Sequence, residues 1–263
     1  MEKINLLSEF ASGPRLEILK ILEKSDAKPA QIAKQTNTTI QALTRHLERL
    51  SDSKLIEKTQ TGSFSLTPIA KTSLYQLPFF DFLSKHNDFF LNHSFDGIPD
   101  TLLSRLGDLN SGELEVNPMK AIQKARDVYV NSKEWFHACA YTIPLEMYDY
   151  AENKLKNKVN LNMVVGKNTF VPKGFYSVPK RKFWEKYAKN GLVEERFVEH
   201  IPINVVVTES DAHLIFANKE LGEPLEPIIL FGKDELFRNW CTDLFEYYWN
   251  DVPKIPEFKL QER

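Results

Sequence analysis

The sequence predicts an α+β domain at the N-terminus, followed by a larger α/β domain. One face of the segment 40–50 carries apolar residues spaced three, four and three apart, which is typical of an α-helix: Ile40, Leu43, Leu47 and Leu50. Residues 55–66 alternate around a glycine, which predicts a short β-hairpin. From about residue 134 onward, strand-like and helix-like segments alternate, as in a sheet covered by helices.

Capping residues and prolines predict where the N-terminal helices begin and end. A first helix is expected from about Pro14, because proline suits a first helical position and Ser12 is a suitable cap. A second helix is expected over 29–35, and the cap-rich stretch 36–39 opens the helix 40–50. After the hairpin, Thr67-Pro68 begins another helix that runs to about Leu77. The order of helix, helix, helix, hairpin, helix is that of a winged helix-turn-helix.

The helix 40–50 also has a polar face, which carries Gln41, Arg45 and Arg49. A helix with these two faces can pack on a small core and enter a DNA major groove, where Gln pairs with adenine and Arg with guanine. We therefore expect double-stranded DNA as a partner. The candidate DNA-binding residues are Thr38, Thr39, Gln41, Ala42, Thr44, Arg45, His46, Arg49 and, on the hairpin, Lys58. In the alternative, the domain makes protein contacts and its arginines pair with Glu48 or Asp52.

Residues 79–90 form an aromatic-rich helical stretch in which phenylalanines recur at heptad-like spacing. Such a stripe needs a partner surface. It either packs against its own C-terminal domain or joins two copies of the chain, and one helix could do both. The expected organisation is a DNA-binding domain over 1–77, a linker or dimerisation helix over 78–94, an α/β sensor domain over 95–252 and a frayed tail over 253–263.

The C-terminal domain is expected to combine helices and strands in one sheet. The helices are expected over 145–155, 181–190 and 236–249. One strand is expected within 127–140, and further strands are expected over 159–166, 194–198, 204–208, 212–217 and 227–230. A ligand pocket would lie at the carboxyl ends of such strands.

Polar residues near the predicted strand ends give the candidate ligand-binding residues His137, Tyr141 and Lys167, with Thr208 nearby. Three aromatic residues could supply a wall of the pocket: Trp135, Tyr176 and Trp184. The alternative is that Trp135, Tyr141 and Trp184 belong to the core. For any single one of these residues, the core position is the favoured interpretation.

Composition narrows the function classes. The chain has 263 residues and a net charge of −2, but residues 1–77 hold 11 basic and 8 acidic residues, whereas residues 78–263 hold 23 and 28. This mild asymmetry suits a DNA reader with a separate sensing domain. No apolar run approaches the ~18 residues that span a bilayer, and the first residues do not resemble a signal peptide. We expect a cytoplasmic protein without a membrane partner.

Known catalytic and metal-binding patterns are missing from the sequence. It contains no G-x-G-x-x-G, Walker A, G-x-S-x-G or H-E-x-x-H pattern. The two cysteines, Cys139 and Cys241, form no spaced motif and suit a reducing compartment, where isolated cysteine is usually a small buried hydrophobe. We therefore expect no catalytic residues, no cofactor and no metal site.

Two segments carry a family resemblance. The stretch 30–70, with Thr44-Arg45-His46-Leu47-Glu48-Arg49-Leu50 at its centre, resembles ArsR-type winged-helix regulators of archaea and bacteria. The stretch 92–109 and the closing segment 245–249 resemble the C-terminal domain of archaeal regulators of the methanogenesis regulatory protein family. The resemblance implies a transcriptional regulator.

The C-terminal domain also resembles sensor domains with a phospholipase D-like fold. Phospholipase D-type catalysis needs a histidine followed two residues later by lysine, and none of the six histidines meets this condition. A shared fold would therefore be non-catalytic here.

Taken together, the sequence favours a sequence-specific DNA-binding transcriptional regulator. We expect it to be a homodimer whose C-terminal domain senses an unidentified small-molecule effector or a partner. Two alternatives stay open. One is an adaptor that uses the winged helix and the segment 79–90 for protein contacts. The other is an enzyme with an accessory winged helix, for which the sequence offers no clustered polar residues.

Overall fold

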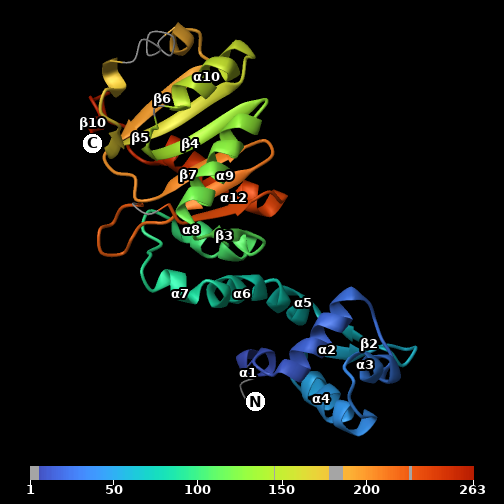
Figure 1. The fold of residues 1–263 in the computed structure, drawn as a ribbon. Helices are drawn as coiled ribbons and strands as arrows, with labels where there is room; N and C mark the ends of the chain where they lie inside the picture. The colour runs from blue at the N-terminus through green and yellow to red at the C-terminus, as the bar shows by residue number, and fades with distance from the viewer. Residues whose placement is uncertain (1–5, 145, 178–185, 225–226) are drawn as a thin grey trace. The chain divides into compact units, whose positions relative to one another are not determined.

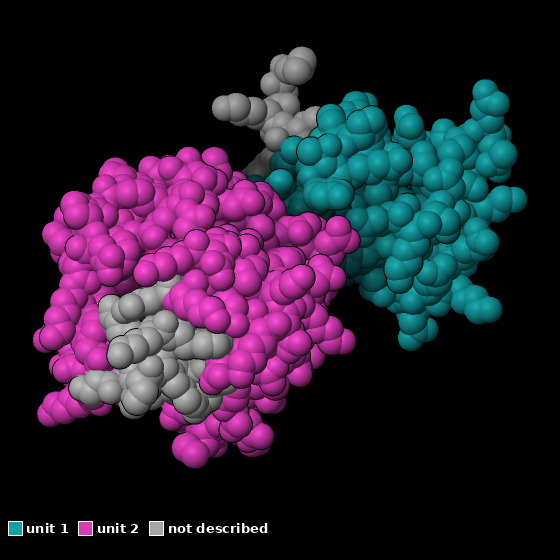
Figure 2. Space-filling view, turned by 90° about the horizontal axis from the view of Figure 1, so that it is seen from above, with its two compact units in different colours: residues 1–77 teal, residues 78–263 magenta. Residues whose placement is uncertain are grey.

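The computed structural model describes residues 6–144, 146–177, 186–224 and 227–263 (Figure 1). The chain divides into two compact units, residues 1–77 and 78–263, which Figure 2 colours separately. Each unit has its own apolar core.

Unit 1 is mainly helical and contains one short hairpin. Its helices are α1 (Leu6–Phe10), α2 (Gly13–Lys24), α3 (Pro29–Gln35), α4 (Ile40–Asp52) and α5 (Pro68–Leu74). The hairpin pairs β1 (Ile56–Lys58) antiparallel with β2 (Phe64–Leu66). Pro29 and Pro68 occupy the first turns of their helices, where the missing N–H costs nothing.

The core of unit 1 lies under α4. Leu43, Leu47 and Leu50 are buried together with apolar residues of α2, α3 and the hairpin. Ile40 differs from the expectation, because it is 53% exposed. It is the first residue of α4, and side chains on a helix point towards its N-terminus, so Ile40 points past the end of the core. Three residues, rather than four, form the buried face.

Unit 2 begins with short helices and then forms a large sheet. Its helical segments are α6 (Leu77–Lys85), α7 (Asn87–Phe90), α8 (Asp100–Leu103), η1 (Leu106–Leu109), α9 (Pro118–Asn131), α10 (Glu146–Lys156), η2 (Phe175–Ser177), α12 (Glu235–Glu246) and the π-helical turn η3 (Tyr247–Asp251). Its strands are β3 (Glu113–Glu115), β4 (Trp135–Thr142), β5 (Asn160–Val171), β6 (Val193–Val198), β7 (Asn204–Thr208), β8 (Ala212–Ile215), β9 (Ile229–Gly232) and β10 (Gln261–Glu262).

The described strands form one mixed sheet in the order β10-β5-β4-β7-β8-β9-β3, with β6 also paired to β5. β5 runs parallel to β4, β6 and β10, whereas β4, β7, β8, β9 and β3 pair antiparallel in turn. Helices cover both faces, as Figure 1 shows. One face packs on α12 through residues such as Cys139, Val205 and Trp240, and the other packs on α9 and α10 through residues such as Ala138 and Leu155. A three-layer α/β arrangement results.

The aromatic segment 79–90 packs on the core of its own unit. Phe82 is fully buried in the cluster that contains Trp240, and Phe90 stacks on Phe95 with ring centroids 4.2 Å apart. Packing within the chain is therefore present in the structure. Phe80 and Leu91 are 54% and 64% exposed and take no part in this core.

Several C-terminal elements differ from the expectation. The helix α9 and the strand β3 were not expected, nor was a strand in the tail, where β10 pairs with the end of β5. The backbone N–H of Gly174 also donates to Glu262 Oε1 at 3.1 Å. Of the helix expected over 181–190, residues 186–189 are helical, and residues 181–185, including Trp184, lie outside the described residues. Both cysteines are buried free thiols.

Candidate functional site

The start of α4 is fixed by threonine side chains. Thr39 Oγ1 accepts a hydrogen bond from the backbone N–H of Ala42 at 3.2 Å, which caps the helix. Thr36 Oγ1 and Thr38 Oγ1 lie 2.8 Å apart in the preceding turn. Asn37 takes a φ of +50°, a conformation that asparagine adopts more readily than most residues. This turn presents the first residues of α4 to solvent.

Gln41 and Arg45 lie one turn apart at the exposed start of α4. Within the described part of the chain, neither side chain makes a hydrogen bond or an ion pair with a protein group. Ala42 is exposed beside them, whereas Thr44 Oγ1 donates to the carbonyl of Ile40 at 2.8 Å. Gln41 and Arg45 are therefore available to an external partner, and the Thr44 hydroxyl already has one.

Arg49 has a partner inside unit 1. Its Nε lies 2.9 Å from Oε1 of Glu9, a carboxylate that is 1% exposed on α1. Nε of Arg15 lies 2.8 Å from the other oxygen of the same carboxylate. The ion pairs expected in the alternative, from Arg45 or Arg49 to Glu48 or Asp52, are not among those of the described residues. Arg49 therefore anchors α1 to α4, although 61% of its side chain is exposed.

The hairpin offers one further cation. Lys58 is exposed on β1 and lines a groove of about 630 Å³ together with Thr44, Glu48 and Asp52. The hairpin turn is held by Thr59, whose Oγ1 accepts from the N–H of Ser63, and Gly62 in the turn has a φ of +79°. His46 of α4 is half-buried. The groove beside Lys58 thus carries acidic as well as basic charge, unlike the start of α4.

The three candidate ligand residues of unit 2 do not meet in one cavity. Tyr141 is buried and lines a cavity of about 540 Å³, which neither His137 nor Lys167 lines. His137 stacks on Phe245 on the α12 side of the sheet with ring centroids 4.6 Å apart, and burial lowers its pKa to about 4. Lys167 is exposed, and its Nζ lies 2.8 Å from Oε1 of Glu199.

Tyr141 is the candidate with the most developed surroundings. Its hydroxyl donates to Glu223 Oε2 at 2.5 Å, and its backbone N–H donates to Asn204 Oδ1 at 3.1 Å. Burial, together with the hydrogen bond to Glu223, raises the pKa of Tyr141 to about 12. The phenol therefore stays neutral at physiological pH.

The other pocket residues expected from the sequence have structural contacts. Thr208 is fully buried, and its Oγ1 donates to the carbonyl of Asp211 at 3.1 Å. Trp135 packs against the α12-side core, and the Tyr176 hydroxyl accepts from the N–H of Leu260. These residues do not gather into the aromatic wall that the sequence suggested.

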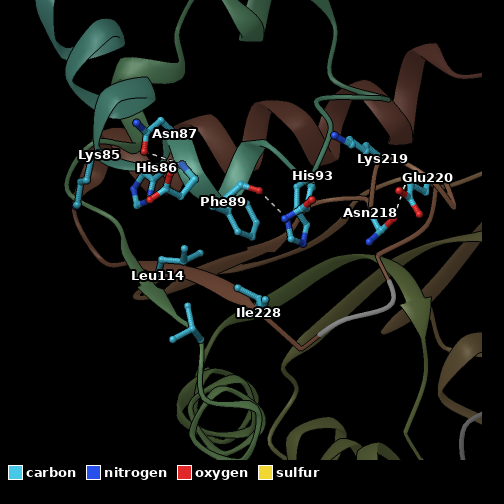
Figure 3. A pocket seen from close by; sticks show the side chains of 13 residues that line it. Lys85, His86, Asn87, Phe89, His93, Leu114, Asn218, Lys219, Glu220 and Ile228 are labelled. Atoms are coloured by element: carbon cyan, nitrogen blue, oxygen red, sulfur yellow. Dashed lines mark hydrogen bonds between the residues drawn. The ribbon is translucent and has the colours of Figure 1, made fainter.

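A polar groove of about 550 Å³ lies beside α7, and Figure 3 shows it from close by. Nζ of Lys85 donates to the carbonyls of Asn110 and Gly112 at 3.2 and 2.8 Å, so this cation already has partners. His86 is buried, and burial, with a smaller contribution from Lys85, lowers its pKa. His93 Nδ1 lies 2.9 Å from the carbonyl of Phe89. These contacts join α6 and α7 to the loops around them.

The described residues contain no group of three or more His, Cys, Asp or Glu side chains that could hold a metal ion. In the same part of the chain, no helix is both long and apolar enough to cross a bilayer.

Sequence reasoning missed the helix that forms one wall of the Tyr141 cavity. This helix, α9, contributes Ile122, Ala125, Arg126 and Tyr129 to the lining. Its start could have been found, because Asn117 Oδ1 caps it by accepting from the N–H of Lys120 at 3.1 Å, and Pro118 follows the cap. An Asn-Pro pair at this position is a helix-start signal.

No family model and no curated protein matches this sequence. Among solved structures, the chain is similar to TrmBL2, an archaeal chromatin protein whose structure is described as showing a novel mode of DNA binding. That similarity has 12% identity and a TM-score of 0.41, and it covers 96% of this chain and 98% of the other. The phospholipase D family member Nuc from Salmonella typhimurium matches at 12% identity and a TM-score of 0.39, over 56% of this chain and 99% of the other.

An O-methyltransferase family protein from Burkholderia thailandensis is also similar, with 13% identity and a TM-score of 0.27, over 77% of this chain and 65% of the other. At such identities and scores, these similarities assign neither a family nor an activity to the chain. The functional argument therefore depends on its own residues.

Proposed function

We propose that this protein is a sequence-specific DNA-binding transcriptional regulator that reads DNA with the start of α4. In this proposal, α3, the turn 36–39 and α4 act as a helix-turn-helix, and the β1–β2 hairpin acts as its wing. The observation that carries the proposal is the pair Gln41 and Arg45, exposed and unpartnered within the described residues at the start of a helix whose other face is buried. Gln and Arg are the side chains that pair bidentately with adenine and guanine in the major groove.

The remaining candidate residues have different roles in this proposal. Thr38, Thr39 and Ala42 lie beside Gln41 at the helix start, where recognition helices approach base edges. His46 and Lys58 would contact phosphates, which position a protein without reading sequence. Thr44 would do so only by releasing its hydrogen bond to the Ile40 carbonyl. Arg49 contributes at most its exposed end, because its Nε binds Glu9.

We further propose a homodimer, with two α4 helices about one DNA turn (~34 Å) apart on a pseudo-palindromic site. Unit 2 then acts as the sensor, and a ligand that alters it changes the spacing or orientation of the two readers. The ArsR-type and methanogenesis-regulator relationships stay predictions, as does a role without enzymatic activity.

The test measures DNA affinity by fluorescence anisotropy with a site selected from random sequence. Arg45→Ala should weaken binding to that site by roughly five- to hundredfold, because each good bidentate contact contributes about 1–3 kcal/mol of discrimination. Lys24→Ala, which removes an exposed cation of α2, is the control and should retain most of the affinity. A folded Arg45→Ala protein with unchanged affinity and specificity would contradict the proposal.

The adaptor alternative has one observation in its favour, the exposed apolar side chains Phe80 and Leu91. Salt separates the two functions. DNA binding should weaken steeply as salt rises from 50 to 200 mM, because neutralised phosphates release counterions. Docking through an apolar surface should change little over that range.

A further inference from the structure

The cavity beside Tyr141 lies on the face of the unit 2 sheet that is covered by α9 and α10. It has a volume of about 540 Å³, within the range of about 300–1,000 Å³ typical of sites for small organic molecules. Apolar and aromatic side chains dominate its lining, among them Ile122 and Tyr129 from α9, Tyr141 from β4 and Phe170 from β5. Such a wall favours a flat, apolar ligand body.

His213 supplies a polar atom without a partner in this wall. It lies on β8, lines the cavity and is 1% exposed, and its Nδ1 has no hydrogen-bond partner among the described residues. The imidazole is flanked by the rings of Tyr129 and Phe231, at centroid distances of 6.1 and 5.6 Å. A buried polar group is normally hydrogen-bonded, so an imidazole without a partner among the described residues, in the wall of a cavity, indicates a place for a ligand group.

The imidazole is a neutral partner. Burial lowers the pKa of His213 to about 3, so the ring carries no charge at physiological pH. It can form a hydrogen bond with a ligand, but it offers no positive charge to an anion.

The charges at the rim do not favour an anion either. Arg126 lines the cavity, and its guanidinium lies 5.1 Å from the ring centroid of Tyr150, but the exposed carboxylate of Glu146 lines the same cavity. A second carboxylate, Glu223, accepts the hydrogen bond of Tyr141. A second cation, Arg263, lies 5.1 Å from the ring centroid of Phe170 and beside Tyr141. Two cations and two carboxylates balance, so the rim gives no net attraction for a negative ligand.

We propose that this cavity binds a neutral, mainly aromatic small molecule whose single hydrogen-bonding group meets the imidazole of His213. The inference rests on the sensing role proposed above for unit 2, but it is tested without DNA, so that a failure of DNA binding leaves it untouched. The ligand class is that of an aromatic amine, an indole or a phenol.

The experiment uses the full chain and N-phenyl-1-naphthylamine, an uncharged fluorescent probe with one N–H donor. Titration should give saturable binding with one probe per chain and increased emission. Ala125→Trp places an indole in the cavity from α9 and should weaken probe binding at least tenfold. Ala188→Trp, the same change at an exposed position outside the cavity, should leave it unchanged. Equal binding by both variants would overturn the site.

His213→Phe keeps a ring in place but removes both ring nitrogens, and it should weaken probe binding about three- to tenfold, the usual effect of one lost hydrogen bond. Unchanged affinity in a folded variant would overturn the role of His213, and near-ultraviolet circular dichroism establishes folding. The anionic analogue 8-anilino-1-naphthalenesulfonate tests the charge. Tighter binding of this analogue in the same cavity, recognised by its loss in Ala125→Trp, would overturn the preference for a neutral ligand.

DNA affinity measured with and without the probe then tests the sensing role separately. A probe that binds unit 2 but leaves DNA affinity unchanged supports the ligand site and counts against its proposed link to DNA reading. Loss of DNA binding by Arg45→Ala with intact probe binding would support a ligand site that does not depend on the DNA-reading side chain.

Discussion

Two arginines on α4 show how neighbouring residues of one type acquire different roles. Arg45 has no hydrogen bond or ion pair within the described part of the protein, whereas Arg49 binds the buried carboxylate of Glu9. An unpartnered, exposed arginine contributes little to folding. A partner of a buried carboxylate contributes more, because its removal leaves that charge less well solvated.

This difference predicts different stabilities for two matched variants. Arg45→Ala should change the free energy of unfolding by less than about 0.5 kcal/mol, as is usual for surface substitutions. Arg49→Ala should lower it by about 1 kcal/mol, a value discounted because the side chain is 61% exposed. Urea denaturation measures both. Equal effects of the two substitutions would contradict the structural role of Arg49.

His213 predicts a pH dependence of stability. The unfolded residue binds a proton near pH 6.5, whereas burial lowers the pKa in the folded state to about 3. Between these values the unfolded state binds more protons, so stability is fully present above pH 6.5 and is lost as pH falls towards 3. His213→Phe should reduce the slope in this window by up to about 1.4 kcal/mol per pH unit.

Denaturation of the wild type and of His213→Phe at several pH values measures this slope. His200→Phe serves as the control, because His200 is exposed. The slope of this control should match that of the wild type. A His213→Phe protein with the wild-type slope would mean that the imidazole is not held neutral in the folded protein.

At the scale of the elements, the hairpin depends on the left-handed conformation of Gly62. Its φ is +79°, and a Cβ added there would meet no atom within 4 Å, so the effect of Gly62→Ala comes from backbone strain alone. We expect a loss of about 1 kcal/mol of stability. Gly13→Ala is the matched control at the start of α2, where space is also open and φ is ordinary. It should be neutral or stabilising. Thermal denaturation compares the two, and equal shifts would contradict the strain argument.

The helix α6 makes a second prediction, because it has a buried and an exposed phenylalanine. Phe82→Ala should destabilise unit 2 by about 3–5 kcal/mol, since the side chain is fully buried in the core. Phe80→Ala should leave the unfolding free energy nearly unchanged, since that residue is 54% exposed. Sedimentation velocity adds the test of association. A dimer that depends on α6 should weaken in Phe80→Ala, and a dimer that persists would place its interface elsewhere.

Periodicity and caps predicted the elements that depend on local sequence. The helix α3 and the strand β7 lie at the expected residues, and Thr39 and Thr67 cap the helices that they were expected to open. Contacts between distant residues were not predictable in this way. The ion pair between Glu9 and Arg49 joins residues 40 apart, and the pairing of β10 depends on where β5 ends.

The candidate sites also differ in whether they depend on local sequence or on contacts between distant residues. The exposed face of α4 follows from helical spacing, so Gln41 and Arg45 could be chosen from sequence. The cavity beside Tyr141 could not, because α9, β4, β5 and β8 meet there only after the sheet forms, and His213 gave no local signal. His137 and Lys167 are close in sequence to the cavity residues Tyr141 and Phe170. In the structure, however, His137 packs on the α12 side of the sheet and Lys167 is exposed.

At the scale of the whole molecule, the two units have separate cores and carry separate chemistries. Unit 1 presents exposed hydrogen-bonding side chains that have no partner among the described residues, and unit 2 forms a mainly apolar cavity whose wall holds the imidazole of His213. A ligand bound in unit 2 can change DNA binding only if it shifts the chain between conformations, or between association states, that differ in DNA affinity. That coupling is the property that would make the protein a regulator.

The most direct test of the central claim is selection of bound fragments from genomic DNA by the full chain at ~150 mM salt, near physiological ionic strength, followed by sequencing. The account predicts enrichment of a pseudo-palindromic motif with half-sites about one DNA turn apart, and loss of that enrichment for a folded Arg45→Ala variant. Failure of the wild type to enrich any sequence, with and without a ligand bound in unit 2, would contradict the claim that α4 reads DNA.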